Sequence, residues 1–268
     1  MKILLLNYMN LFLKIQNKSR SVKMPSRKKI AIIGFGRFGQ LMAKYLSEDF
    51  EVYVSSSRKI RNSIRKTGAI PASLKDACNK DFVIPAVPIS QFESVLKSIG
   101  PLLRKNSLVV DVCSVKEYPV KLMKRILPKN VQILATHPLF GPDSAADSLK
   151  GRKIVICRVR INDKLYARIK NFLKKKGLSV LEMSPQKHDE EIAKSLLLTH
   201  FIGRGLIESK ASSLEVATEG YNKLIEVLNN VKHDSWQLFE DMNRFNKYAK
   251  ETRQNFIKSI EKINRKLK

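Results

Sequence analysis

Short apolar runs rich in β-branched residues alternate with segments of helical spacing over the first two thirds of the chain. In residues 40–47, for example, apolar positions recur every three or four residues, as on one face of a helix. Alternation of strand and helix predicts an α/β fold with a Rossmann-type, doubly wound parallel sheet. The expected strands are residues 29–33, 50–54, 81–87, 108–113, 132–136, 154–159 and 178–181.

The pattern changes after Met183. Ser184 suits a helix cap, and Pro185 suits the first helical position. No convincing strand follows, and proline is absent after Pro185. We therefore predict an extension over residues 1–28, a sheet domain over 29–183 and an all-helical domain over 184–268.

The chain carries a formal net charge of +27, which suits either nucleic acid or an anionic small molecule. Lysine and arginine are spread along the chain, without a zinc-finger or RNA-binding signature. We interpret the charge as a solvated basic surface and expect no nucleic-acid partner. Cys78, Cys113 and Cys157 are odd in number and lie in apolar runs, which indicates reduced thiols rather than disulfides or a metal site.

The first 28 residues contain no acidic residue and combine apolar with basic positions. This composition suits an organelle-targeting segment. The alternative is an upstream extension with Met24 as the true start, which we favour, and we then expect a cytoplasmic protein. No apolar stretch is long enough to span a membrane, so no membrane partner is expected.

A glycine-rich turn, Gly34-Phe35-Gly36-Arg37-Phe38-Gly39, follows the first expected strand and opens a helix. The first glycine permits a tight turn, the second lets the backbone approach a pyrophosphate, and the third lets helix and strand pack closely. The helix N-terminus then offers unpaired N–H groups to the phosphates. The alternative is a turn without a ligand, but strand, spacing and helix together predict a dinucleotide site.

The end of the second expected strand distinguishes the two nicotinamide cofactors. An NAD site usually places a carboxylate there for the ribose 2′-hydroxyl, whereas this chain has Ser55-Ser56-Ser57-Arg58. Arginine and hydroxyl groups bind a 2′-phosphate through charge-assisted hydrogen bonds, although a loop arginine can also simply face solvent. We predict NADP rather than NAD, bound by the glycine-rich turn with Ser56, Ser57, Arg58 and Val87.

Three further motifs fall at carboxyl ends of expected strands or at the start of the helical domain, where doubly wound folds place their function. They are Asp111-Val112-Cys113-Ser114-Val115-Lys116, then Thr136-His137-Pro138-Leu139-Phe140-Gly141-Pro142-Asp143, and finally His188-Asp189 with Thr199-His200-Phe201-Ile202-Gly203-Arg204. With the glycine-rich turn, their order and spacing resemble the prephenate/arogenate dehydrogenase family, closest to its plant-type arogenate branch. The resemblance covers about residues 29–248. The arginine-rich segment that binds the substrate carboxylate in the bacterial prephenate enzymes has no counterpart here.

The resemblance implies oxidative decarboxylation of arogenate or prephenate in tyrosine biosynthesis. This reaction needs a base for the ring hydroxyl, and histidine is the side chain that titrates near neutral pH. We assign His137 this catalytic role. Ser114 is expected to hydrogen-bond the same hydroxyl or the imidazole, with a helix cap as its alternative. Lys116 is expected to meet the cofactor or a substrate carboxylate, with a solvated lysine as its alternative.

His200 and Arg204 are four residues apart and share one face of a helix that is apolar nearly all round. Buried histidine and arginine need polar partners, and an anionic substrate would supply them. The alternative for Arg204 is an internal salt bridge with Asp189 or a C-terminal glutamate.

The same helix contains two glycines, Gly203 and Gly205, which weaken a helix and therefore predict close packing against another helix or a ligand. We interpret His188-Asp189 as structural, tying the helix start to the substrate region. By resemblance, the helical domain is expected to form a homodimer.

Two other classes of function remain compatible with the residues. One is a two-domain Rossmann dehydrogenase of the β-hydroxyacid or imine reductase type, whose catalytic lysine lies on the first helix after the sheet, where this chain has Lys187 and Lys194. The other is a non-enzymatic dinucleotide-sensing or nucleic-acid-binding protein, which the charge alone supports. The choice between arogenate and prephenate is left open.

Overall fold

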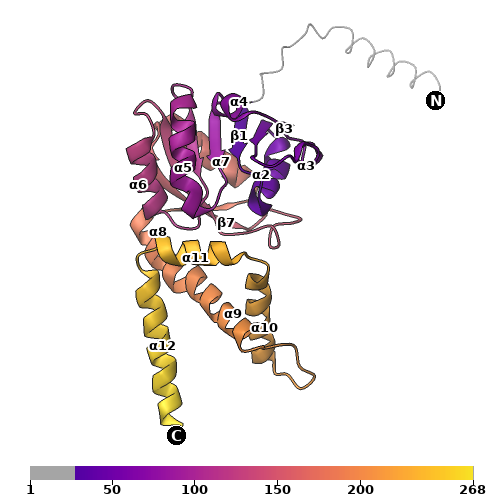
Figure 1. Cartoon of the computed structure of the whole chain (residues 1–268), viewed down its shortest axis with the longest axis vertical. Helices are drawn as coiled ribbons and strands as arrows, with labels where there is room; N and C mark the ends of the chain where they lie inside the picture. The colour runs from indigo at the N-terminus through magenta and orange to yellow at the C-terminus, as the bar shows by residue number, and fades with distance from the viewer. Residues whose placement is uncertain (1–27, 268) are drawn as a thin grey trace, which may run out of the picture.

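The computed structural model describes residues 28–267, so the extension expected over residues 1–28 falls almost entirely outside the described part. An eight-stranded sheet forms one half of the molecule, with strand order β3-β2-β1-β4-β5-β6-β7-β8 (Figure 1). The strands are β1 (Lys29–Ile33), β2 (Glu51–Ser55), β3 (Ile70–Pro71), β4 (Phe82–Pro85), β5 (Leu108–Asp111), β6 (Gln132–Pro138), β7 (Lys153–Arg160) and β8 (Ser179–Glu182).

The seven expected strands are all present, but the sheet is not wholly parallel. β1 to β6 pair in parallel, whereas β7 is antiparallel to β6 and parallel to β8. Because residues 139–152 contain no helix, the chain can reverse between β6 and β7, as an antiparallel pair permits. The short strand β3 was not expected, because Ile70–Pro71 is too brief to show a period.

Helices cover both faces of the sheet, as in a doubly wound fold. Apolar side chains of α4, α5 and α6 pack on one face, and those of α2 and α7 pack on the other. The helices of this half are α2 (Arg37–Ser47), α3 (Arg61–Lys66), α4 (Leu74–Cys78), α5 (Ile89–Ile99), the 3₁₀ turn η1 (Gly100–Leu102), α6 (Glu117–Ile126) and α7 (Asp163–Lys175).

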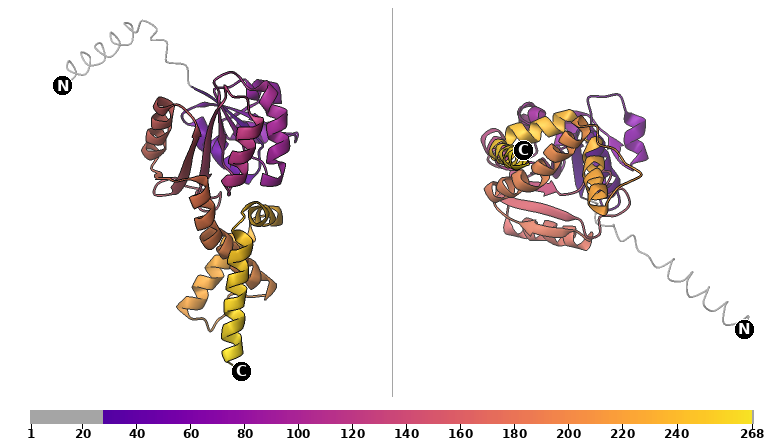
Figure 2. Two further views of the ribbon diagram at one scale, coloured as in Figure 1. Left: turned by 90° about the vertical axis from the view of Figure 1, so that its left-hand side faces the viewer. Right: turned by 90° about the horizontal axis from the view of Figure 1, so that it is seen from below.

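The second half is helical, as predicted. The side chain of Ser184 accepts a hydrogen bond from Lys187 N, and Pro185 occupies the first turn, so the expected helix start is confirmed. The elements are α8 (Pro185–Ile192), the π-helical turn η2 (Ala193–Leu197), α9 (Leu198–Glu208), α10 (Glu219–Lys232), α11 (Trp236–Phe245) and α12 (Ala249–Lys266). Figures 1 and 2 show this half below the sheet, with α12 projecting away from it.

Two packing contacts fix the helical half. The main apolar cluster of the sheet continues into Ile192, Leu197, Met242 and Ala249, so both halves share one core. A Cβ on Gly203 would lie 2.5 Å from a Val231 methyl carbon, which confirms the expected close packing of α9 against α10. Gly205 has open space around it, so packing does not explain that glycine.

Candidate active site

The glycine-rich turn lies where β1 ends and α2 begins, at the edge of the sheet where the parallel strands have their carboxyl ends. Gly34 adopts φ +104°, and a Cβ there would overlap the carbonyl of Ala86 after β4. A Cβ on Gly39 would lie 2.8 Å from Gly34 O, whereas no atom lies within 4 Å of a Cβ on Gly36. Two glycines are thus required for packing, and the third leaves room for a phosphate.

The residues expected around the cofactor gather at this turn. The Arg58 guanidinium donates to Phe35 O over 2.7 Å, and the backbone N of Arg58 donates to Ser56 Oγ over 3.2 Å. Val87 lies 3.0 Å from a Cβ built on Gly34, while Ser57 is exposed. Residues 52–65 contain no acidic side chain, so the loop after β2 presents hydroxyls and cations only.

Arg37 and Phe38 connect the turn to distant segments. Arg37 pairs with Asp143 over 2.6 Å, in the loop after β6, and donates to His233 O over 3.0 Å, at the end of α10. The Phe38 ring lies 6.5 Å from that of Phe140. The glycine-rich turn, the His137 loop and the helical half therefore meet at one junction.

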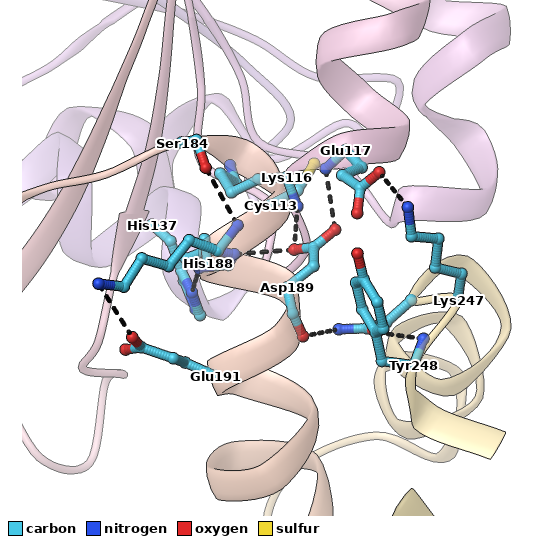
Figure 3. Close-up of polar contacts among 12 residues, drawn as sticks. Cys113, Lys116, Glu117, His137, Ser184, His188, Asp189, Glu191, Lys247 and Tyr248 are labelled. Carbon is cyan, nitrogen blue, oxygen red and sulfur yellow. Dashed lines mark hydrogen bonds and ion pairs between the residues drawn. The ribbon is translucent and has the colours of Figure 1, made fainter. Parts of the chain in front are cut away.

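His137 lies near the carboxyl end of β6 and is 4 % exposed. Its Nδ1 is 2.8 Å from His188 Nε2, and Nε2 forms no hydrogen bond with any of residues 28–267 (Figure 3). Burial, the neighbouring His188 and the Lys116 cation hold the pKa of His137 well below its usual value of 6.5. The imidazole is therefore neutral at neutral pH, as a proton acceptor must be.

His188 and Asp189, which the sequence suggested were structural, contact this histidine directly or through one residue. Asp189 Oδ1 lies 2.8 Å from His188 Nδ1 and also accepts Lys116 N over 2.7 Å. The signal in the sequence was the adjacent histidine and carboxylate one turn after a capped helix start. Only the fold places that pair against β6.

Lys116 does not lie at the surface of the site. Its side chain is completely buried, and Nζ contacts Asp111 and the carbonyl of Thr136. The expected contact with cofactor or substrate is thus replaced by an internal ion pair below His137. The Ser114 hydroxyl forms no hydrogen bond within residues 28–267 and does not cap α6, whose cap position is Lys116.

His200 and Arg204 lie on one face of α9, and both contact Asp234, which the sequence reasoning missed. His200 Nε2 is 3.7 Å from Asp234 Oδ2, and the Arg204 guanidinium donates to Asp234 O. Neither partner proposed for Arg204, Asp189 or a C-terminal glutamate, is used. His200 Nδ1 and Arg204 Nε are buried without a partner among residues 28–267.

The surroundings of Arg204, and the positions of Lys187 on α8 and Lys194 on η2, bear on the alternative functions named above. Trp236 is 60 % exposed, and the Arg204 guanidinium lies 5.7 Å from its ring centroid. Lys187 and Lys194 are exposed, and Lys187 Nζ lies 3.8 Å from Glu191 at the surface.

Within residues 28–267 no cluster of histidine, cysteine and acidic residues suits a metal ion, and no helix is long and apolar enough to cross a membrane.

Comparisons with known proteins agree with this geometry. Residues 52–182 match the family model "Prephenate dehydrogenase, nucleotide-binding domain", and residues 206–268 match "TYRAAT1-like, C-terminal domain". The chain is 35 % identical over 252 residues to "Arogenate dehydrogenase 2, chloroplastic" of Arabidopsis thaliana, covering 90 % of this chain and 70 % of that protein. It is 33 % identical to "Arogenate dehydrogenase 1, chloroplastic" of the same plant, covering 93 % of this chain but 40 % of that longer protein.

A solved structure shares the fold. The prephenate dehydrogenase of Aquifex aeolicus, in complex with hydroxyphenyl propionate and NAD⁺, superposes with a TM-score of 0.71 at 22 % identity, covering 90 % of this chain and 91 % of that one. At the level of sequence, the plant relatives decide the assignment: this chain belongs to the prephenate/arogenate dehydrogenase family of oxidoreductases.

Proposed function

We propose that this chain catalyses the NADP-dependent oxidative decarboxylation of arogenate in tyrosine biosynthesis. The observation that carries the proposal is the placement of His137. It lies, buried and neutral, at the same edge of the sheet as the glycine-rich turn, and Arg37 joins that turn to the loop after His137. A base and a dinucleotide turn at one edge suit removal of a proton and a hydride from one alcohol.

The residues around the turn fit a dinucleotide with a 2′-phosphate. Gly36 leaves open space, and Arg58 is held against the carbonyl of Phe35 with no acidic side chain nearby. Bound NADP⁺ would supply the hydride acceptor. The role of this chain's residues is then to bind the two phosphate positions and to exclude water from the junction.

His137 accepts the proton of the ring hydroxyl as the carbonyl forms. Its Nε2 has no protein partner within residues 28–267, so that nitrogen is available to the substrate. The unpaired Ser114 hydroxyl can donate a hydrogen bond to the substrate oxygen from the neighbouring strand end. Loss of carbon dioxide then aromatises the ring and leaves a phenolate, which takes back the proton held by His137, so no further acid or base is needed.

The substrate side chain is proposed to lie at His200, Arg204 and Asp234. A buried His200 Nδ1 and a buried Arg204 Nε lack partners within residues 28–267. A substrate carboxylate would accept from Arg204 Nε, and a substrate N–H could donate to His200 Nδ1. The Asp234 carboxylate, between His200 and Arg37, suits a cation. Arogenate has an ammonium group where prephenate has a keto oxygen, so Asp234 favours arogenate.

The experiment that tests the function is a cofactor-reduction assay that crosses arogenate and prephenate with NADP⁺ and NAD⁺. We expect the highest kcat/KM with arogenate and NADP⁺. Turnover of neither substrate by a folded protein that still binds NADP⁺ would contradict the proposal.

The same assay on Asp234→Asn tests the choice of substrate. Removing the carboxylate should lower kcat/KM for arogenate by about 10- to 100-fold, the usual worth of a charged hydrogen bond, and leave prephenate equal or improved. Glu240→Gln, an exposed carboxylate on the neighbouring helix α11, is the matched control and should leave the ratio unchanged. An unaltered ratio in Asp234→Asn would remove Asp234 from the discrimination.

We also propose that α12 mediates a homodimer. Ile257, Ile260, Ile263 and Leu267 are all exposed and recur every three or four residues, so they form one apolar face on the projecting helix. A second copy can cover this face with the same face of its own α12. Ile260→Lys should shift the mass measured by light scattering from dimer to monomer, and a monomeric wild-type chain would contradict the proposal.

A further inference from the structure

Three side chains lie in a line that begins at the proposed base. His137 Nδ1 is 2.8 Å from His188 Nε2, and His188 Nδ1 is 2.8 Å from Asp189 Oδ1 (Figure 3). His188 and Asp189 are each 1 % exposed. Water therefore cannot substitute for either contact, and the protons in this line must be distributed among the three side chains.

The far end of the line determines where those protons lie. Asp189 Oδ1 accepts Lys116 N over 2.7 Å, and Oδ2 accepts Glu117 N over 2.9 Å. Backbone N–H groups can only donate, so both carboxylate oxygens act as acceptors. His188 Nδ1 must then donate to Asp189, which leaves a lone pair on His188 Nε2. His137 Nδ1 donates to that lone pair, and the lone pair of His137 is left on Nε2.

We propose that His188 and Asp189 are positioning residues that hold His137 in the tautomer with its lone pair on Nε2 and take up the positive charge when that nitrogen receives the substrate proton. This inference rests on the proposed function only for the origin of that proton. The tautomer itself is a property of the folded chain.

The charges around His137 explain why such a relay is needed. The charges that act on His137 or on His188 come from Asp189 on α8 and from Lys116 and Asp111. Burial and Lys116 both oppose a cation here, since they lower the pKa of His137 and of His188. Lys116 is already paired with Asp111, so Asp189 is the carboxylate left to stabilise an imidazolium.

The proton transfer needs no reagent beyond the hydride acceptor of the proposed function. The substrate O–H bond breaks as an N–H bond forms at His137 Nε2, and the O–H electrons form the carbonyl as the C–H bond of the same carbon breaks and its hydride would leave to bound NADP⁺. The His137 Nδ1–H bond then breaks as an N–H bond forms at His188 Nε2. The positive charge thereby moves to a ring in contact with Asp189, and His188 Nδ1 keeps its proton throughout.

Nitrogen NMR of ¹⁵N-histidine-labelled protein tests the tautomer without turnover, because protonated and lone-pair ring nitrogens have well-separated shifts. The chain has four histidines, so assignment by single substitutions is practicable. We expect His137 to show a protonated Nδ1 and a lone pair on Nε2. In Asp189→Asn, the amide oxygen can replace only one of the two carboxylate oxygens, each of which accepts a backbone N–H, so His188 Nδ1 meets an acceptor in one amide orientation and a donor in the other. We therefore expect both tautomers of His137 to be populated in this variant.

Kinetics on the same variants test the consequence. Asp189→Asn should lower kcat by about 10²- to 10⁴-fold with little change in KM, because the charge that stabilises the imidazolium is lost and part of the protein holds the wrong tautomer. His188→Gln offers an amide oxygen to His137 Nδ1, so it should keep the tautomer but lose charge transfer, with an intermediate loss of kcat. Glu191→Gln, an exposed carboxylate on the same stretch of chain, is the control and should match the wild type.

Two results would overturn the proposal. One is a wild-type His137 with its proton on Nε2; the other is an Asp189→Asn protein in which His137 keeps the wild-type tautomer alone. Asp189 also accepts hydrogen bonds from the backbone at the start of α6. The result for Asp189→Asn is therefore used only if this variant unfolds at the same temperature as the wild type. If it does not, the wild-type tautomer and the tautomer in His188→Gln decide. A chain that turned over neither substrate would contradict the proposed function. The NMR experiment would still test the tautomer, because it does not depend on turnover.

Discussion

The two ends of the junction are built in different ways. At the proposed cofactor end, the backbone conformation of Gly34, Gly36 and Gly39 shapes a turn from six consecutive residues. At the proposed substrate end, side chains from distant segments meet: Asp234 contacts His200, and the main chain of the same loop contacts Arg37. A local backbone motif tolerates change elsewhere in the chain, whereas a constellation of side chains depends on the packing of the whole helical half.

The largest effect is expected at His137, the proposed base. His137→Asn should lower kcat by about 10²- to 10⁴-fold, the usual contribution of general base catalysis. NADP⁺ affinity, measured by calorimetry, should remain unchanged, since the glycine-rich turn is untouched. His233→Asn replaces an exposed histidine and serves as the control. A kcat within about tenfold of the wild type would remove His137 from the mechanism.

A charge reversal at the cofactor end should alter cofactor choice and nothing else. Arg58→Asp removes a cation and adds a carboxylate suited to a ribose 2′-hydroxyl, so the NADP/NAD ratio of kcat/KM should fall by about 10- to 100-fold. Lys59→Asp, its exposed neighbour, should change the ratio much less. An unaltered ratio in Arg58→Asp would place the 2′-phosphate elsewhere.

Gly203 and Gly205, two residues apart on α9, test how tightly the helical half is packed. Gly203→Ala forces a methyl group against Val231 and should lower the free energy of unfolding by about 1–3 kcal/mol. Gly205→Ala meets open space and should raise it by up to about 1 kcal/mol through helix propensity. Urea unfolding of both variants measures the difference. Equal effects would mean that α9 and α10 do not pack as described.

The smallest effect concerns pH. Burial lowers the pKa of His200 below 6.5, so its neutral form stabilises the fold above that pH, and this contribution is lost as pH falls towards the folded-state pKa. Between pH 7.5 and pH 6, the wild type should lose up to about 0.8 kcal/mol more stability than His200→Asn does. Equal losses in urea unfolding at the two pH values would show that His200 is solvated.

The sequence predicted the sheet half well because its signals are local. Apolar runs, the glycine spacing and the Ser184-Pro185 helix start each depend on a few adjacent residues, and all were found. The reversal of β7 was missed because strand direction depends on the connection rather than on the strand. The contact of Asp234 with His200 and that of His188 with His137 were missed because each joins residues far apart in the sequence. The burial of Lys116 was not predicted, because a lysine is expected at the surface unless a buried partner such as Asp111 is known.

The π-helical turn Ala193–Leu197 has a consequence for how this protein tolerates insertions and deletions. An α-helix advances about 100° per residue, and a π-helical turn accommodates about one extra residue within an otherwise continuous helix. The turn therefore sets the rotational phase of α9 relative to α8. Deleting one residue there would restore an ideal helix, yet it would swing His200 and Arg204 around the axis while His188 stayed in place. The connection over residues 209–218 could absorb the same deletion without a change in helix phase. A deletion that is harmless between α9 and α10 would therefore, within the π-helical turn, move His200 and Arg204 away from His188 in the proposed substrate site.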